Sequence, residues 1–244
     1  MTFAPSVPVA LDELYAAFDR VPPPRTITHC GAHPMTDREL GDLLNAGPLR
    51  GIPAQILEPY AGNCSFLWPA TPPADDLRYF TPRILEIVAG DRRLWPDLES
   101  LGRVLGSIAT EWTEPERDAI HQVLRALWQH QLSTDPAADP HLPDLAEILR
   151  AAGRFSGDAT PYLREWTTSL DQRWPASHLA DLLLVEALPD WARYLEEVGA
   201  AQLNTWLHGP DLRDAARRVY EATPDDADAT TLAAYLVWPF EVDT

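Results

Sequence analysis

The chain has 244 residues, and its 37 acidic side chains outnumber its 19 basic ones, which gives a formal net charge of −18. Every base is an arginine, because the sequence contains no lysine. An excess of negative charge repels phosphate backbones and anionic headgroups, so we expect neither nucleic acid nor a membrane surface as a partner.

Two capping boxes predict where helices begin. In each box a threonine N-cap is followed three residues later by a glutamate whose carboxylate accepts the backbone N–H of the threonine. The first box is Thr36 with Glu39, and Gly47 should close its helix. The second box is Thr113 with Glu116. We therefore expect a helix to start directly after each threonine.

The spacing of apolar residues predicts helices along most of the chain. From Leu98 to Trp112 and from Ile120 to Trp128, apolar residues recur at three- and four-residue steps, which is the period of one face of a helix. Further helices are predicted over residues 10–20, 75–89, 143–155, 161–172, 177–188, 190–206, 211–221 and 227–237. Only residues 26–28 show a trace of the alternation typical of a β-strand.

These elements indicate an all-α protein. About ten helices joined by short, proline-marked connections are typical of an irregular bundle or of stacked helical hairpins. No segment of fixed length recurs, so a regular solenoid is the less favoured alternative. We expect a single helical domain over residues 1–244, in which two packed halves would meet near the polar, proline-rich residues 133–143.

Three features favour a cytoplasmic location. The two cysteines are too few for a disulfide scaffold. The N-terminus lacks the positively charged segment of a secretory signal. No apolar segment approaches the roughly 20 residues that a membrane span needs.

The loop before Thr36 contains the residues best suited to a metal ion. Cys30 and His33 are spaced so that one turn could present both to the same zinc ion, with His29 or the distant Cys64 as further ligands. A second closely spaced Cys or His pair, usual in structural zinc sites, is missing. A packed loop without a cofactor is therefore the competing interpretation, and Cys30 as a catalytic thiol is a third.

Signatures of other common chemistries are absent from the sequence. It contains no G-x-S-x-G elbow, no Walker A loop, no G-x-G-x-x-G and no H-E-x-x-H. We therefore name no catalytic residue, and an enzyme is the less favoured interpretation.

The most distinctive string is Phe80-Thr81-Pro82-Arg83-Ile84-Leu85-Glu86. It resembles a Phe-x-Pro-Arg-Ile-Leu-Glu block in a group of uncharacterised bacterial all-helical proteins, in which a Cys/His loop also precedes the first capped helix. The resemblance covers about residues 10–130 and implies no activity. From the residues themselves, Pro82 either kinks a helix or opens a new one, and Arg83 and Glu86 pair within that helix or reach partners on other elements.

Negative charge is concentrated at the C-terminal end. No base follows Arg218, whereas six acids do, accompanied by two aromatic residues that we expect to bind a partner with them: Glu221, Asp225, Asp226, Asp228, Tyr235, Trp238, Glu241 and Asp243. Complementary charge speeds encounter with a basic protein, and aromatic side chains supply buried anchors. The competing interpretation is a solvated face that confers solubility.

The sequence thus favours a cytoplasmic, acidic, helical protein-binding module. Its partner would be a basic protein that it neutralises, in the manner of an immunity protein. The alternative is a metal- or thiol-dependent enzyme centred on His29, Cys30 and His33.

Overall fold

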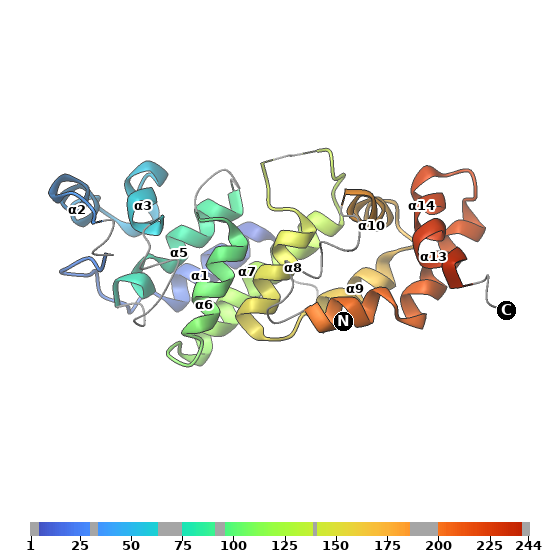
Figure 1. Cartoon of the computed structure of the whole chain (residues 1–244). Coiled ribbons are helices and arrows are strands. Elements are labelled where there is room, and N and C mark those ends of the chain that lie inside the picture. The colour runs from blue at the N-terminus through green and yellow to red at the C-terminus, as the bar shows by residue number, and fades with distance from the viewer. Residues whose placement is uncertain are drawn as a thin grey trace. The chain divides into compact units, whose positions relative to one another are not determined.

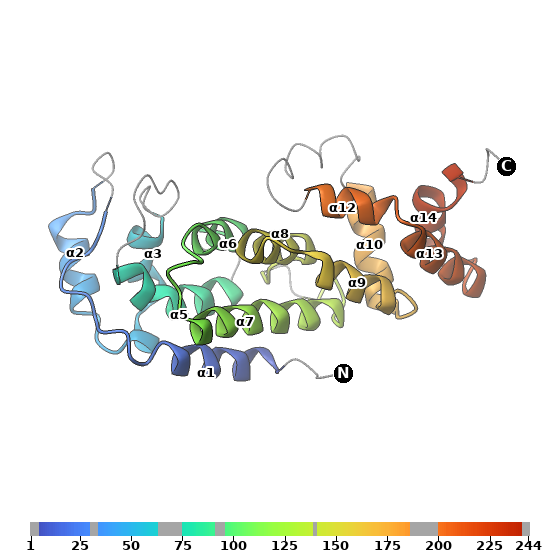
Figure 2. The ribbon, with the colours of Figure 1, turned by 90° about the horizontal axis from the view of Figure 1, so that it is seen from below.

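The computed structural model of the chain confirms the all-α prediction (Figures 1 and 2). The structure describes residues 5–29, 34–62, 75–90, 96–138, 141–185 and 200–240. These residues form twelve α-helices and two short 3₁₀ helices, and they contain no β-strand. No helix among them is both long and apolar enough to cross a bilayer.

The chain divides into two units, and the division falls inside one helix. Unit 1 comprises Met1–Leu127 with His141–Pro143, and unit 2 comprises Trp128–Pro140 with Asp144–Thr244. The shared helix is α7 (Glu114–Leu132). We predicted that residues 1–244 form a single domain whose two halves meet near residues 133–143, and this stays a prediction.

Each unit contains several helices besides its part of α7. Unit 1 holds α1 (Val7–Ala17), α2 (Asp37–Leu44), η1 (Leu49–Gly51), α3 (Ala54–Ala61), α5 (Asp75–Gly90) and α6 (Leu98–Ser107). Unit 2 holds α8 (Leu145–Ser156), α9 (Thr160–Ser169), α10 (Arg173–Val185), α12 (Ala200–Leu207), α13 (Pro210–Ala222), α14 (Ala227–Leu236) and η2 (Trp238–Phe240).

The capping boxes set helix starts as predicted. The Thr36 hydroxyl accepts the Glu39 N–H at 3.2 Å, and the Glu39 carboxylate accepts the Thr36 N–H at 2.7 Å, so α2 begins at the next residue. At α7 the Glu116 carboxylate accepts the Thr113 N–H at 2.8 Å. Gly47 has a φ of 86°, a left-handed conformation that favours glycine where the chain turns away after α2.

The structure differs from the sequence patterns in some local details. Helix α6 ends at Ser107, short of Trp112, whose indole N–H donates to the Leu105 carbonyl at 3.0 Å and so satisfies one of the free carbonyls at the end of the helix. Helix α3 was not predicted, because it is short and interrupted by Pro59. Residues 26–28 form no strand.

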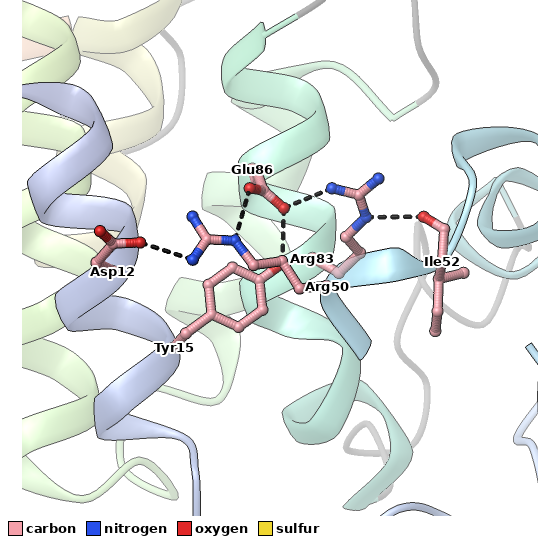
Figure 3. A network of polar contacts seen from close by, with 6 residues as sticks. All are labelled: Asp12, Tyr15, Arg50, Ile52, Arg83 and Glu86. Atoms are coloured by element: carbon pink, nitrogen blue, oxygen red, sulfur yellow. Dashed lines mark hydrogen bonds and ion pairs between the residues drawn. The ribbon is translucent and has the colours of Figure 1, made fainter. Parts of the chain in front are cut away.

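A charged network in unit 1 joins α1, η1 and α5 (Figure 3). The Glu86 carboxylate accepts hydrogen bonds from the Tyr15 hydroxyl at 2.7 Å, from Arg83 Nη1 at 2.5 Å and from Arg50 Nε at 3.3 Å. Burial and the hydrogen bond to Glu86 raise the pKa of Tyr15, so its phenol stays a proton donor to this carboxylate.

The two arginines of this network also hold neighbouring elements. Arg50 Nη1 lies 2.6 Å from the Asp12 carboxylate on α1, and Arg83 Nε donates to the Ile52 carbonyl at 2.8 Å (Figure 3). Arg83 therefore pairs within α5 and also reaches a partner outside it, so both of the arrangements considered for the Phe-x-Pro-Arg-Ile-Leu-Glu block occur. Pro82 lies inside α5, which runs through it without ending.

A second ion pair in unit 1 buries a carboxylate. Arg78 on α5 binds Glu116 on α7 through two parallel hydrogen bonds of 2.8 Å, while Glu116 also caps α7 through Thr113. Glu116 is only 2% exposed. The pair therefore connects α5 to the start of α7 through a carboxylate that has little access to water.

The core of unit 2 is built on tryptophans. Trp128 and Trp166 are fully buried and pack edge to face, with ring centroids 5.5 Å apart. Trp166 also donates its indole N–H to the Pro175 carbonyl at 2.9 Å. Helices α10 and α14 contact each other, and both contain fully or almost fully buried alanines, whose small side chains allow close packing: Ala176, Ala180, Ala229 and Ala233.

We predict that Arg78→Gln lowers the free energy of unfolding by about 2 kcal/mol, because it removes the cation that compensates the buried Glu116 carboxylate. The matched control is Arg38→Gln. Arg38 pairs with Asp42 at 3.6 Å on a surface where both side chains are mostly exposed, so the change should stay within about 0.5 kcal/mol. Urea denaturation followed by circular dichroism measures both. Equal losses in the two variants would contradict this account.

Candidate functional site

The predicted acidic site falls on the C-terminal hairpin, which we define as α13, the turn at residues 223–226, α14 and η2. Helices α13 and α14 lie side by side in both views (Figures 1 and 2). Glu221 lies in the last turn of α13 and Asp225 in the connecting turn. Both side chains are exposed, and neither has a hydrogen bond or an ion pair in the described part of the chain. They are available to a partner.

Two other acids of this set have structural partners instead. Asp226 is the N-cap of α14, and its carboxylate accepts the N–H groups of Asp228 and Ala229, each at 3.0 Å. Asp228 accepts a hydrogen bond of 2.5 Å from the Ser177 hydroxyl on α10 and is half-buried. An aspartate directly before a helical pattern is a common N-cap, a signal that was present in the sequence. Glu241 and Asp243 lie outside the described residues.

Aromatic side chains accompany the free acids. Tyr235 is 38% exposed and Trp238 is 41% exposed, although most large apolar side chains of the described chain are buried. Trp238 packs edge to face with Tyr220 on α13, with ring centroids 5.7 Å apart. Tyr220, which directly precedes Glu221, was missed by the sequence analysis. The hairpin thus combines unpaired carboxylates with aromatic surface.

The predicted metal site lies mostly outside the described residues, which include His29 but not Cys30, His33 or Cys64. His29 is half-buried, and its Nδ1 atom is buried without a hydrogen-bond partner among the described residues. The described part of the chain contains no group of three or more His, Cys, Asp or Glu side chains placed to hold an ion. Zinc binding therefore stays a prediction.

The segment that leads into this loop is anchored by a buried carboxylate. Asp76, at the start of α5, is 2% exposed and accepts the Thr28 N–H at 2.6 Å. Burial raises the pKa of Asp76, although its backbone hydrogen bonds act in the opposite direction. Burial, and then the nearby Asp76 charge, raise the pKa of Tyr60. The sequence suggested only that Asp75 and Asp76 begin a helix, where acids are normally exposed.

Unit 2 also contains a groove that the sequence gave no means of finding. It lies between α9, α12 and α13 and has a volume of about 790 Å³. Its lining comes from residues 160–168 and 202–218, two segments that come together only in the folded chain.

Comparison with protein-family models, with curated proteins and with solved structures finds no match for this chain.

We predict that Asp226→Ala costs about 1 kcal/mol of stability, because the first turn of α14 loses the carboxylate that accepts two of its N–H groups. Asp225→Ala removes the same charge from the preceding, unpaired position and should change stability by less than about 0.3 kcal/mol. Thermal and urea denaturation of the two variants compare them directly. Equal effects would show that Asp226 is no more structural than Asp225.

Proposed function

We propose that this chain is a protein-binding module whose C-terminal hairpin binds a basic protein partner. The observation that carries the proposal is the combination, on that hairpin, of two exposed, unpaired carboxylates with exposed aromatic side chains. Glu221 and Asp225 supply the charge, and Tyr235 and Trp238 supply the apolar surface.

The electrostatics of the hairpin support a cationic partner. No base follows Arg218 in the chain, and Arg217 pairs with Asp214 at 3.7 Å, within α13 itself. Neither Glu221 nor Asp225 forms an ion pair with an arginine in the described part of the chain. Unpaired surface charges of one sign steer a partner of the opposite sign and raise the rate of encounter.

The exposed aromatic rings supply the apolar contact area that charged side chains alone do not provide. Tyrosine and tryptophan dominate the energetics of protein interfaces, because they bury a large area with little loss of side-chain entropy. Arginine and lysine side chains of a partner also bind favourably over the face of such rings. The hairpin thus suits a basic protein that covers Trp238 while it pairs with the two carboxylates, which is the arrangement expected of a module that neutralises its partner.

The experiment compares two charge reversals of equal size. In Glu221→Arg/Asp225→Arg the reversals lie on the hairpin, whereas in Glu13→Arg/Asp19→Arg they lie at exposed positions at and after α1. Asp226 and Asp228 are left in place because they have structural partners. Each variant and the wild type is immobilised, a lysate of the native host is passed over it, and retained proteins are identified by mass spectrometry.

We expect the wild type and the Glu13→Arg/Asp19→Arg variant to retain the same basic protein, and Glu221→Arg/Asp225→Arg to lose it. With that partner purified, the hairpin variant should bind at least about tenfold more weakly than the control variant, since close charge pairs at interfaces contribute more than 1.4 kcal/mol. Retention of no basic protein, or equal loss in both variants, would reject the hairpin as the binding site.

A metal-dependent enzyme is the second candidate, and one observation favours it. The buried Nδ1 of His29 has no hydrogen-bond partner among the described residues, and in the sequence Cys30, a second residue type that binds zinc, follows His29 directly. Elemental analysis of protein purified without an affinity tag tests this directly. The candidate requires close to one equivalent of zinc or iron, with loss of the metal in His29→Ala. Less than about a tenth of an equivalent excludes it.

A further inference from the structure

The groove between α9, α12 and α13 has the composition of a small-molecule site. Leu163 and Leu212, which are almost fully buried, and the half-buried Trp206 belong to its lining. Four threonines from α9 and α12 add hydroxyl groups to its lining: Thr160, Thr167, Thr168 and Thr205. A concave apolar surface with a few polar groups, in a volume of about 790 Å³, matches the usual size and character of ligand pockets.

The aromatic side of the groove is held in place before any ligand binds. Trp206 donates its indole N–H to the Thr167 hydroxyl at 2.7 Å. Its ring also lies 5.4 Å from the ring of the fully buried Trp166, with the two planes inclined by 30°. Because these contacts fix the indole, a ligand that packs on it does not have to order it.

Two arginines that line the groove indicate that its ligand carries negative charge. Arg164 on α9 and Arg218 on α13 line it, are exposed, and have neither a hydrogen bond nor an ion pair in the described part of the chain. Other arginines of unit 2 are engaged: Arg217 pairs with Asp214, and Arg173 stacks on Trp174. Two unpaired guanidinium groups at one groove are unexpected in a chain with a net charge of −18.

The acids of the described groove lining form no ion pair with these two cations. They are Asp211 and Asp214, and Asp214 is paired with Arg217. The pKa of the neighbouring Asp158 is lowered mainly by hydrogen bonds from Thr160 and only to a lesser degree by Arg164.

We infer that this groove binds a small organic anion, with its apolar body packed on Trp206 and its carboxylate or phosphate group held by Arg164 and Arg218. Guanidinium groups match the planar, two-oxygen geometry of both kinds of anion. The inference rests on the groove alone and does not depend on the proposed function of the hairpin.

Isothermal titration calorimetry with three naphthalene probes tests the inference. The probes are 2-naphthoate, 2-naphthyl phosphate and uncharged 2-naphthol, which share one apolar body. We expect at least one of the two anions to bind at one equivalent and about tenfold or more tightly than 2-naphthol, because charge-assisted hydrogen bonds each contribute more than a neutral contact. The comparison of 2-naphthoate with 2-naphthyl phosphate then shows which anion the two arginines prefer.

Variants of the groove residues test whether the probes bind in the groove. Arg164→Gln/Arg218→Gln should weaken the bound anion about tenfold and leave 2-naphthol within about twofold. The matched control is Arg20→Gln/Arg25→Gln, which removes two exposed, unpaired arginines of unit 1 and should leave all three probes unchanged. Thr168→Phe, which fills the groove from an exposed position, should weaken every probe. Circular dichroism confirms that each variant is folded.

Three results would overturn the inference. The first is that neither anion binds the wild type. The second is that the anions bind no better than 2-naphthol, and the third is that Arg164→Gln/Arg218→Gln retains full affinity for them.

Discussion

The scarcity of positive charge is the constraint on which the rest of this structure depends. A buried carboxylate without a cation or several hydrogen-bond donors destabilises a fold by several kcal/mol, and this chain has 19 bases for 37 acids. Two buried carboxylates of unit 1 meet this requirement in different ways, because an arginine reaches Glu116 whereas backbone N–H groups hold Asp76. Arg78 binds Glu116 through two hydrogen bonds, and Arg83 and Arg50 both bind Glu86. These few arginines connect α1, η1, α5 and the start of α7.

The same constraint explains where unpaired charge remains. On the C-terminal hairpin, Glu221 and Asp225 have no ion-pair partner among the described residues, and the same hairpin exposes the rings of Tyr235 and Trp238. In the groove it is the bases that stay unpaired, because Arg164 and Arg218 form no ion pair with any carboxylate that the structure describes. Charged side chains that have no ion-pair partner within the fold are the ones available to bind another molecule. The hairpin therefore suits a cationic protein, and the groove suits a small anion.

Features encoded within a few residues were predictable from the sequence. The Thr36–Glu39 capping box and the apolar periodicity of α7 depend only on neighbours in the chain, and both predictions agree with the structure. Contacts between distant residues were not predictable. Tyr15 and Glu86 are 71 positions apart, and the groove combines three helices whose residues show no common motif.

The acidic residues of the hairpin show the same limit of prediction from the sequence, here for single residues. Counting charges placed Asp225, Asp226 and Asp228 in one binding set, but a count does not separate a solvent-exposed carboxylate from an N-cap. The structure makes that distinction, because Asp226 accepts two backbone N–H groups and Asp228 accepts the Ser177 hydroxyl. The free acids of the described hairpin after Arg218 are therefore Glu221 and Asp225.

The central claim is that an unpaired acidic surface attracts a basic partner. Stopped-flow measurement of the association rate constant with that partner, from about 20 mM to about 0.3 M salt, tests it most directly, because screening acts on encounter. The account predicts an association rate constant that falls by about tenfold or more over this range, while the dissociation rate constant changes by less than about threefold. An association rate constant that does not change with salt would contradict it.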